Sequence, residues 1–196
     1  MTLPDLEARF TGVSAEPAYH QDQQLGMVVC QEALVAARCG NYGVGAVLVN
    51  PRGVVVARGQ NSVFYPRFRS DLHAEMVVMN AFEERHPEVD TMRGYTRLSS
   101  VEPCPVCFAR LLAAGVQTVK FLAEDAWGGM VSHRQHLPAS WQKLGQRQAV
   151  CQADVSESLR QFALDVFLVT LDACRQKLWS RWNENKAVSG TPSPGR

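Results

Sequence analysis

The sequence predicts an α/β fold in which helices pack on a sheet, and three observations support this prediction. Stretches with helical periodicity alternate with short β-rich runs in the order α-β-β-α-β-α-β. The turn sequence 50–53 joins the first two β-rich runs into a hairpin. A length of 196 residues, with 46% hydrophobic and 20% charged residues, suits one globular unit with a sizeable core.

The individual elements follow from periodicity and from residues that end them. Helices are expected at 21–38, 72–85, 105–114 and 155–182, and strands at 44–49, 54–57, 95–100 and 116–122. The first helix shows an apolar stripe at helical spacing, made by Leu25, Val28, Val29, Ala33 and Ala36. Gly115 ends the third helix, and residues 59–71 form a polar loop with aromatic side chains.

Composition changes divide the chain into four parts. Residues 1–19 contain two prolines and a glycine and are expected to form an irregular N-terminal arm. Residues 20–125 form the core, and residues 126–187 a C-terminal extension that begins with a loop and continues into the long helix. Residues 188–196 are rich in Ser, Gly and Pro and are expected to be a disordered tail.

Two short segments carry the chemistry of a metal site. His73-Ala74-Glu75 is followed by Pro103-Cys104-Pro105-Val106-Cys107. One histidine and two cysteines hold Zn²⁺ while leaving a fourth position open, where zinc activates water at neutral pH. His73 and Cys104 would each begin a helix, with Cys107 one turn further on, so two helix N-termini would gather three ligands. Buried thiols or a structural zinc are the alternatives, but a structural zinc site needs a fourth ligand, and none stands out.

These residues make the chain similar to the zinc-dependent nucleobase and nucleoside deaminases of the cytidine-deaminase-like superfamily, whose pattern is H-x-E…P-C-x-x-C. The similarity covers about residues 21–125. It implies a three-layer α/β/α fold with a central mixed sheet of about five strands, to which this chain adds a C-terminal helix. It also implies that Glu75 is the catalytic proton shuttle, that Zn²⁺ is the cofactor, and that the protein is a homodimer.

Further site residues are assigned by the same resemblance. Asn61 follows the second strand and is expected to bind the base, since an amide both donates and accepts hydrogen bonds; an ordinary turn asparagine is the alternative. The backbone of Ala74 and the region of Glu102 are expected next to the substrate. Trp127 lies where family members place a segment that closes over the substrate. Independently of the resemblance, Phe64 in the aromatic loop is expected to line the pocket, with packing on the core as an equal alternative.

The resemblance predicts a hydrolytic deaminase but leaves its substrate open. After Cys107 the chain departs from the tRNA-editing branch, with Glu124-Asp125-Ala126-Trp127 in place of Asp-x-Lys-x-Gly, and its net charge is only +1. We therefore favour a small aminoheterocycle, with guanine and cytosine leading, over tRNA. A tRNA enzyme would need a basic groove, for which the candidates are Arg52, Arg58, Arg67, Arg69, Arg93 and Arg97. A non-catalytic zinc-binding partner protein is the other alternative. The presence of Glu75 counts against it, because a protein that only binds zinc does not need a proton carrier.

Composition also suggests a compartment. No apolar run approaches the roughly 20 residues needed to span a bilayer, and the first 20 residues lack the apolar segment of a secretory signal. Four cysteines outside the motif show no disulfide spacing. A cytoplasmic protein with reduced cysteines is expected. His133 and His136 are interpreted as surface histidines, because no third ligand stands near them in the sequence.

Overall fold

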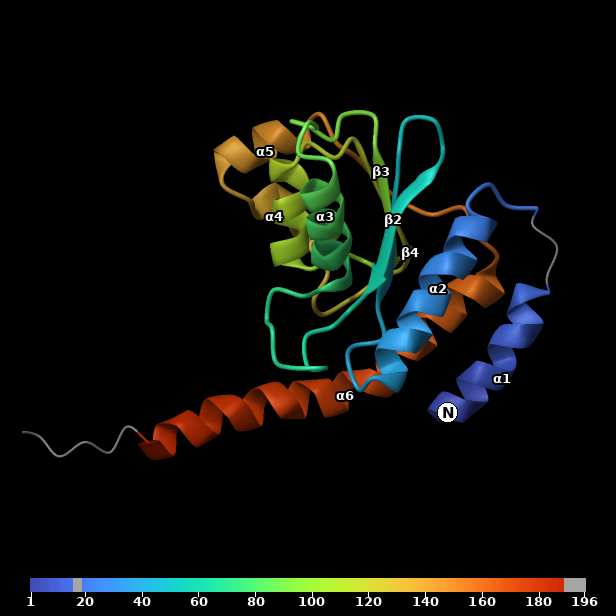
Figure 1. Cartoon of the computed structure of the whole chain (residues 1–196), viewed down its shortest axis with the longest axis vertical. Helices are drawn as coiled ribbons and strands as arrows, with labels where there is room; N and C mark the ends of the chain where they lie inside the picture. Colours follow the sequence, from blue (N-terminus) through green and yellow to red (C-terminus); the bar gives the residue numbers. More distant parts are fainter. Residues whose placement is uncertain (16–18, 189–196) are drawn as a thin grey trace, which may run out of the picture.

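A mixed five-stranded sheet separates two layers of helices in the computed structural model of the chain (Figure 1). The structure describes residues 1–15 and 19–188, with side chains as far as Asn183. The sheet has the order β2-β1-β3-β4-β5. Its strands are β1 (Gly45–Val49), β2 (Val55–Gln60), β3 (Thr96–Val101), β4 (Thr118–Ala123) and β5 (Ala149–Gln152).

The strand directions bring several carboxyl ends to one edge of the sheet. β1 pairs antiparallel with both β2 and β3, while β3, β4 and β5 are parallel to one another. β2, β3 and β4 therefore run in the same direction and end at the same edge. In open α/β sheets this edge is where ligands bind.

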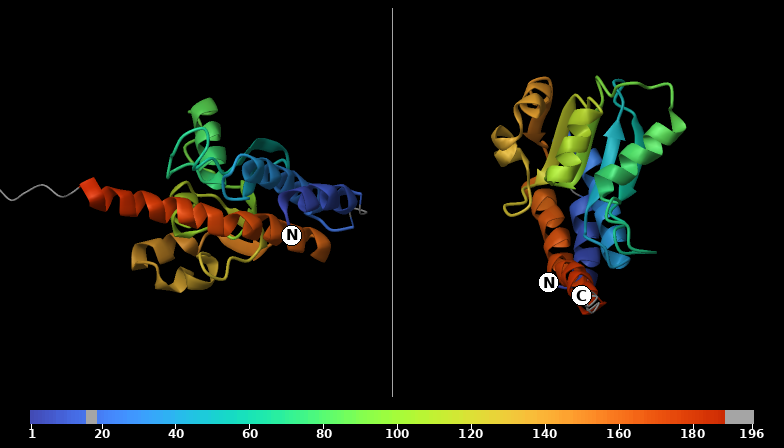
Figure 2. Two further views of the ribbon diagram at one scale, coloured as in Figure 1. Left: turned by 90° about the horizontal axis from the view of Figure 1, so that it is seen from below. Right: turned by 90° about the vertical axis from the view of Figure 1, so that its left-hand side faces the viewer.

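The helices cover the two faces of the sheet unequally (Figures 1 and 2). α1 (Leu3–Ser14), α2 (Gln23–Arg38) and α6 (Glu157–Val188) lie on one side, and α3 (Ala74–Arg85) and α4 (Pro105–Ala113) on the other. A 3₁₀ helix, η1 (Val131–His136), and α5 (Ala139–Gly145) lie outside α4. The C-terminal part of α6 projects past the body of the protein (Figure 2). Within the described residues no helix is both long and apolar enough to cross a membrane.

Strand β1 is buried on both faces because every residue from Gly45 to Val49 is small or aliphatic. Val47 and Val49 point into the core shared with α1, α2 and α6, whereas Ala46 and Leu48 point into the core shared with α3 and α4. The two hydrophobic cores thus meet across one strand, which fixes the position of both helical layers.

Gly45 allows α2 to pack directly against β1. A Cβ atom at this position would lie 2.2 Å from the carbonyl oxygen of Val29 and 2.6 Å from Cβ of Glu32. We expect Gly45→Ala to destabilise the protein by about 1–3 kcal/mol, which corresponds to a fall in Tm of roughly 2–12 °C in thermal unfolding. Gly12→Ala in α1 is the control: its Cβ meets nothing within 4 Å, so Tm should stay level or rise. Equal Tm values for Gly45→Ala and the parent would contradict this packing argument.

The predicted core elements are confirmed, including the hairpin of β1 and β2 and the long helix α6. The irregular N-terminal arm is wrong for Leu3–Ser14, which forms α1. Thr2 and Asp5 make a capping box at its start, and Pro4 stands in the first turn, where a missing N–H costs nothing. Leu6 and Val13 are buried, so packing holds this helix in place.

The C-terminal extension also contains more structure than the sequence indicated. The segment expected to be a loop includes η1, and α5 and β5 follow it before α6. β5 is a short edge strand whose residues are mostly exposed. Its sequence therefore lacks the alternation of apolar and polar residues from which a strand is predicted. Val188 is the last residue of α6; the remainder of the predicted disordered tail, 189–196, lies outside the described residues. The division into domains stays a prediction.

Candidate active site

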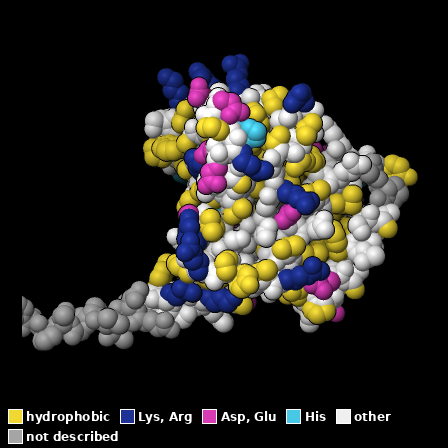
Figure 3. All heavy atoms as spheres, in the orientation of Figure 1, with side chains coloured by type: hydrophobic (Ala, Val, Ile, Leu, Met, Phe, Trp, Pro, Cys, Tyr) yellow, Lys and Arg dark blue, Asp and Glu magenta, His cyan; other side chains and the backbone are white. Residues whose placement is uncertain are grey.

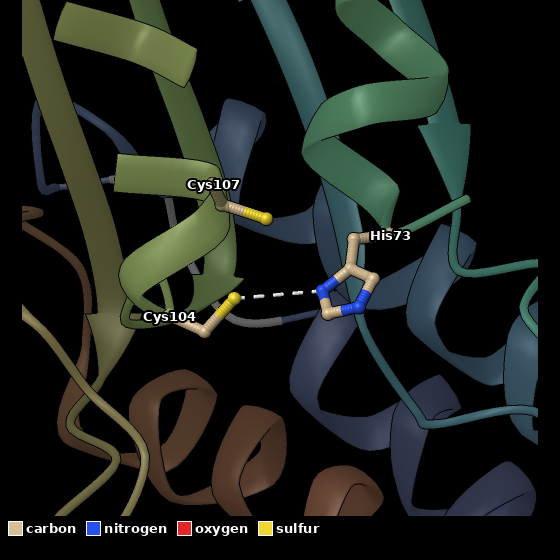
Figure 4. Close-up of side chains that lie close together, drawn as sticks. All are labelled: His73, Cys104 and Cys107. Carbon is tan, nitrogen blue, oxygen red and sulfur yellow. Dashed lines mark hydrogen bonds between the residues drawn. The ribbon is translucent and has the colours of Figure 1, made fainter. Parts of the chain in front are cut away.

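Two helices begin at one spot at the carboxyl edge of the sheet (Figure 4). α3 starts directly after His73, and α4 starts directly after Cys104, where Pro105 takes a first-turn position. Cys107 lies one turn into α4, and its sulfur points toward the His73 ring (Figure 4). The positive ends of both helix dipoles therefore face the same small volume, which favours anionic groups there.

The three predicted ligands come together with the spacing of a metal site. One ligand atom each from His73, Cys104 and Cys107 lie within 4.8 Å of one another. Nδ1 of His73 is 3.5 Å from Sγ of Cys104. Ligands bound at about 2.0–2.3 Å around a tetrahedral zinc stand roughly 3.5 Å apart. The donor set, one nitrogen and two sulfurs, therefore fits Zn²⁺, and no fourth protein ligand joins it among the described residues.

Hydrogen bonds among these three side chains shift the pKa of each one. The hydrogen bond from Cys107 lowers the pKa of Cys104 to about 4, against the effect of burial, and His73 adds to this lowering. The same bond raises the pKa of Cys107 well above its usual value, and burial adds to that rise. The pKa of His73 is raised, first of all by its hydrogen bond with Cys104. A metal bound here would replace the protons that these side chains share.

Glu75 lies beside the ligands but is not one of them. It is the second residue of α3, and its side chain is buried. Its Oε1 accepts a hydrogen bond of 3.5 Å from Nη2 of Arg97 on β3. Arg97 is itself fully buried; burial lowers its pKa, and the negative charges of Glu75, Cys107 and Cys104 oppose that lowering.

A cavity of about 180 Å³ opens onto these residues. Its walls come from the carboxyl ends of β2, β3 and β4, from the starts of α3 and α4, and from α6. The lining residues are Tyr42, Val44, Asn61, His73, Glu75, Val101, Glu102, Cys104, Asp125, Phe167, Leu171 and Arg175. Two of the three ligands, His73 and Cys104, thus face the same cavity as the carboxylate of Glu75 and the amide of Asn61.

Asn61 lines the cavity whereas Ala74 does not, and their contacts with substrate stay predictions. Asn61 follows β2, is buried and lines the cavity. Its Oδ1 accepts a hydrogen bond from the N–H of Val63, while its Nδ2 forms no hydrogen bond with a described residue. Ala74 is fully buried as the first residue of α3, where N–H groups have no partner within the helix.

Phe64 and Trp127 do not line the cavity. The Phe64 ring lies 5.8 Å from that of Tyr42, which does line it, so Phe64 supports the wall from behind. Trp127 is 89% exposed. Its turn is held by Asp125, whose Oδ1 accepts hydrogen bonds from the N–H groups of Trp127 and Gly128. Roles for Phe64 and Trp127 in substrate binding stay predictions.

Sequence reasoning missed several residues of the site. Tyr42, Phe167, Leu171 and Arg175 line the cavity. Burial raises the pKa of Tyr42 to about 12. Periodicity marked the apolar face of α6, but nothing in the sequence showed that this face reaches the metal ligands.

Asn41, also missed, positions the aromatic loop. It is buried, and its Oδ1 accepts hydrogen bonds from the N–H groups of Phe64 and Tyr65. On the far side of the loop, Lys177 and Arg181 of α6 lie over the rings of Phe64 and Phe68. The loop is therefore fixed between the core and α6.

Glu102 serves the architecture of the site. Its two carboxylate oxygens accept hydrogen bonds from the N–H groups of Asp125 and Val131, which joins the ends of β3 and β4. Gly129 packs against this carboxylate so closely that a Cβ would lie 2.3 Å from it. His133 and His136 are exposed, and they do not belong to a group of potential metal ligands among the described residues.

The six arginines proposed for a basic groove differ in burial and in their ion pairs. Arg97 is fully buried, which contradicts its inclusion. Arg58 is paired with Glu32 and Arg69 with Asp71, while Arg52, Arg67 and Arg93 are exposed. On the face shown in Figure 3, Lys and Arg side chains form separate groups with acidic side chains among them.

Comparisons with known proteins agree with this geometry. Residues 20–123 match the family model of the cytidine and deoxycytidylate deaminase zinc-binding region. A tRNA-specific adenosine deaminase from Bacillus subtilis is 35% identical over 111 residues, which are 56% of this chain and 66% of that protein. A tRNA(Ile)-lysidine synthase from Deinococcus deserti is 31% identical over 141 residues, 65% of this chain. The match spans only 25% of the Deinococcus protein.

The fold is shared with solved structures as well. A guanine deaminase from Nitrosomonas europaea superposes with a TM-score of 0.56 at 17% sequence identity, covering 82% of this chain and 92% of that protein. The mixed five-stranded sheet with helices on both faces, followed by a C-terminal helix, thus matches the cytidine-deaminase-like fold.

Proposed function

The chain belongs to the family of the cytidine and deoxycytidylate deaminase zinc-binding region, and from this we propose that it is a hydrolytic deaminase. Members of the family are zinc-dependent hydrolases that act on amine groups. The proposed reaction releases ammonia from the exocyclic amine of a free nucleobase, a nucleoside or a related aminoheterocycle. Guanine and cytosine are the leading candidates.

One observation carries this proposal: the ligands His73 and Cys104, the carboxylate of Glu75 and the amide of Asn61 line the same cavity. A structural zinc site would be closed by a fourth ligand and would need no such neighbours. A zinc ion held by these three ligands would keep one position open, and Glu75 and Asn61 line the cavity beside it.

Different residues of the chain would bind the metal, transfer protons and hold the base. Zinc, when held by His73, Cys104 and Cys107, supplies a water molecule activated as a nucleophile. Glu75 would pass one proton of this water to the ring nitrogen and then carry the second proton, released as the added hydroxyl becomes a carbonyl, to the departing amine. The free Nδ2 of Asn61 would donate to the base edge. Water adds to the ring carbon, the C–N bond breaks, and a carbonyl and ammonia are the products.

The size and lining of the cavity support a small substrate. About 180 Å³ is less than the roughly 300–1,000 Å³ usual for drug-sized ligands. Val44, Val101, Phe167 and Leu171 give it apolar walls that suit a planar ring. Arg175 also lines the cavity, so substrates with an anionic substituent belong among those to be tested.

A tRNA adenosine deaminase is the alternative with specific support, because the Bacillus relative bears that name. The burial of Arg97 and the pairing of Arg58 and Arg69 weaken the case for a basic groove. A non-catalytic zinc protein is a second alternative, which the burial of a carboxylate beside the ligands disfavours. A cytoplasmic location stays a proposal. So does a homodimer, for which the exposed Leu168, Trp179 and Trp182 of α6 offer apolar surface.

The proposal is tested by measuring ammonia release from zinc-loaded protein. The panel holds guanine, cytosine and adenine, their nucleosides and nucleoside monophosphates, and related aminoheterocycles, with Glu75→Ala as the control. Release from one compound, absent in the variant, names the substrate. If no compound in the panel releases ammonia although the protein holds one zinc per chain, the small-molecule proposal is overturned. A tRNA substrate, assayed for inosine, would then be measured next.

Replacement of Asn61 should weaken substrate binding without loss of metal. Asn61→Ala leaves part of the base edge unpaired, which costs about 1–3 kcal/mol and should lower kcat/KM roughly 5- to 150-fold on the compound that the parent deaminates. Zinc content should stay at one per chain. Asn80→Ala on α3, outside the cavity, is the matched control and should keep parental kinetics. Unchanged kcat/KM in Asn61→Ala would show that Asn61 is only a turn residue.

A further inference from the structure

Arg97 is an unusual residue for its position in the fold. It lies on β3 with its Cα paired to those of Leu48 on β1 and Val119 on β4. Those neighbours belong to the hydrophobic core between the sheet and the helices α3 and α4. The side chain of Arg97 is 0% exposed, so its charge is removed from water within an apolar layer. Such burial is strongly unfavourable unless anionic partners and hydrogen bonds offset it.

The partners that the structure provides all belong to the metal centre. Nη2 donates to Oε1 of Glu75 at 3.5 Å, a long hydrogen bond. The negative charges that act on Arg97 are those of Glu75, Cys107 and Cys104. Its Nε and Nη1 are buried and have no hydrogen-bond partner among the described residues. The hydrogen bond to Glu75 and the negative charges of the metal centre are therefore what offsets the burial of this guanidinium.

We propose that Arg97 is a positioning residue of the metal centre, whose charge balances the thiolates of Cys104 and Cys107 together with the carboxylate of Glu75. Zn²⁺ and two thiolates sum to zero charge, and Glu75 adds one negative charge in a buried place. Arg97 supplies the single positive charge that makes the whole group neutral. Its charge acts on the two sulfurs without a direct hydrogen bond, since Nε and Nη1 have no partner among the described residues, and its bond to Glu75 orients the proton carrier. The kinetic part of this inference rests on the proposed function.

Zinc affinity and kinetics of Arg97 variants test this inference. Arg97→Met keeps much of the volume and removes the charge, and Arg58→Met, at an exposed position of β2, is the matched control. We expect the zinc Kd of Arg97→Met, measured by competition with a chelator, to rise at least about tenfold, as for loss of a charged hydrogen bond. We expect kcat to fall at least about tenfold with little change in KM. Arg97→Lys, which keeps the charge, should recover part of both.

The outcomes separate a role at the metal centre from a purely structural one. In a structural role the Tm of metal-free Arg97→Met would fall while zinc Kd and kcat of the folded protein stayed within twofold of the parent. That result would overturn the inference. If Arg97→Met does not fold, Arg97→Lys is compared with the parent by Co²⁺ titration: a shifted thiolate-to-cobalt absorption band supports the inference, and an identical band with unchanged affinity overturns it. The measurements of zinc and cobalt binding test the role of Arg97 even if no substrate is found. In that case only the proposed function fails.

Discussion

Glu75→Gln is expected to abolish ammonia release almost completely while leaving zinc bound. The amide has nearly the shape of the carboxylate but cannot accept a proton from water. Loss of a positioned general acid–base lowers rates by about 10²–10⁴-fold, and here the same side chain would move several protons in one cycle. Activity on the substrate found in the panel should therefore fall by at least about 10³-fold. Metal analysis of the same sample should still show one zinc per chain.

The matched control for this variant is Glu84→Gln. Glu84 lies on the same helix, α3, but its side chain is exposed and does not line the cavity. It should retain parental activity. Ammonia release by Glu75→Gln within tenfold of the parent would show that Glu75 is not the proton carrier. A biological role that survives the substitution unchanged would instead favour the non-catalytic zinc protein.

Cys107→Ser is expected to remove zinc from the protein. A serine hydroxyl stays protonated at neutral pH and cannot replace a thiolate ligand, and two remaining ligands hold the metal poorly. After dialysis against a chelator that leaves the parent loaded, zinc content should fall well below one per chain, and activity by more than about 10²-fold. Zinc should raise the Tm of the parent but not that of the variant, because a ligand stabilises only the state that binds it.

Cys151→Ser provides the control for this experiment. Cys151 is exposed on the edge strand β5 and is not part of the cavity. Its replacement should leave zinc content, activity and the zinc-dependent rise in Tm unchanged. A Cys107→Ser protein that kept one zinc per chain through dialysis would contradict the assignment of Cys107 as a ligand.

Local sequence was sufficient wherever short-range chemistry decides structure. The β1–β2 hairpin followed from the turn 50–53, and the starts of α3 and α4 followed from the motif residues at their first turns. Helix α1 was missed because two prolines and a glycine in residues 1–19 were interpreted as breakers. The interaction of Thr2 with Asp5 and the burial of Leu6 and Val13 stabilise the helix instead. Edge strand β5 was missed because most of its side chains are exposed.

The sequence by itself determined the reactive groups of this protein: a histidine, two cysteines and a glutamate at spacings that place them at helix starts. Those relations are local, since they depend on a turn of helix and on caps. Tertiary structure decided the rest. Arg97 resembled a surface arginine until β3 was placed between β1 and β4, which buries it beside Glu75. Phe167, Leu171 and Arg175 reach the cavity only because α6 packs back along the sheet, a contact between distant segments that no local pattern encodes.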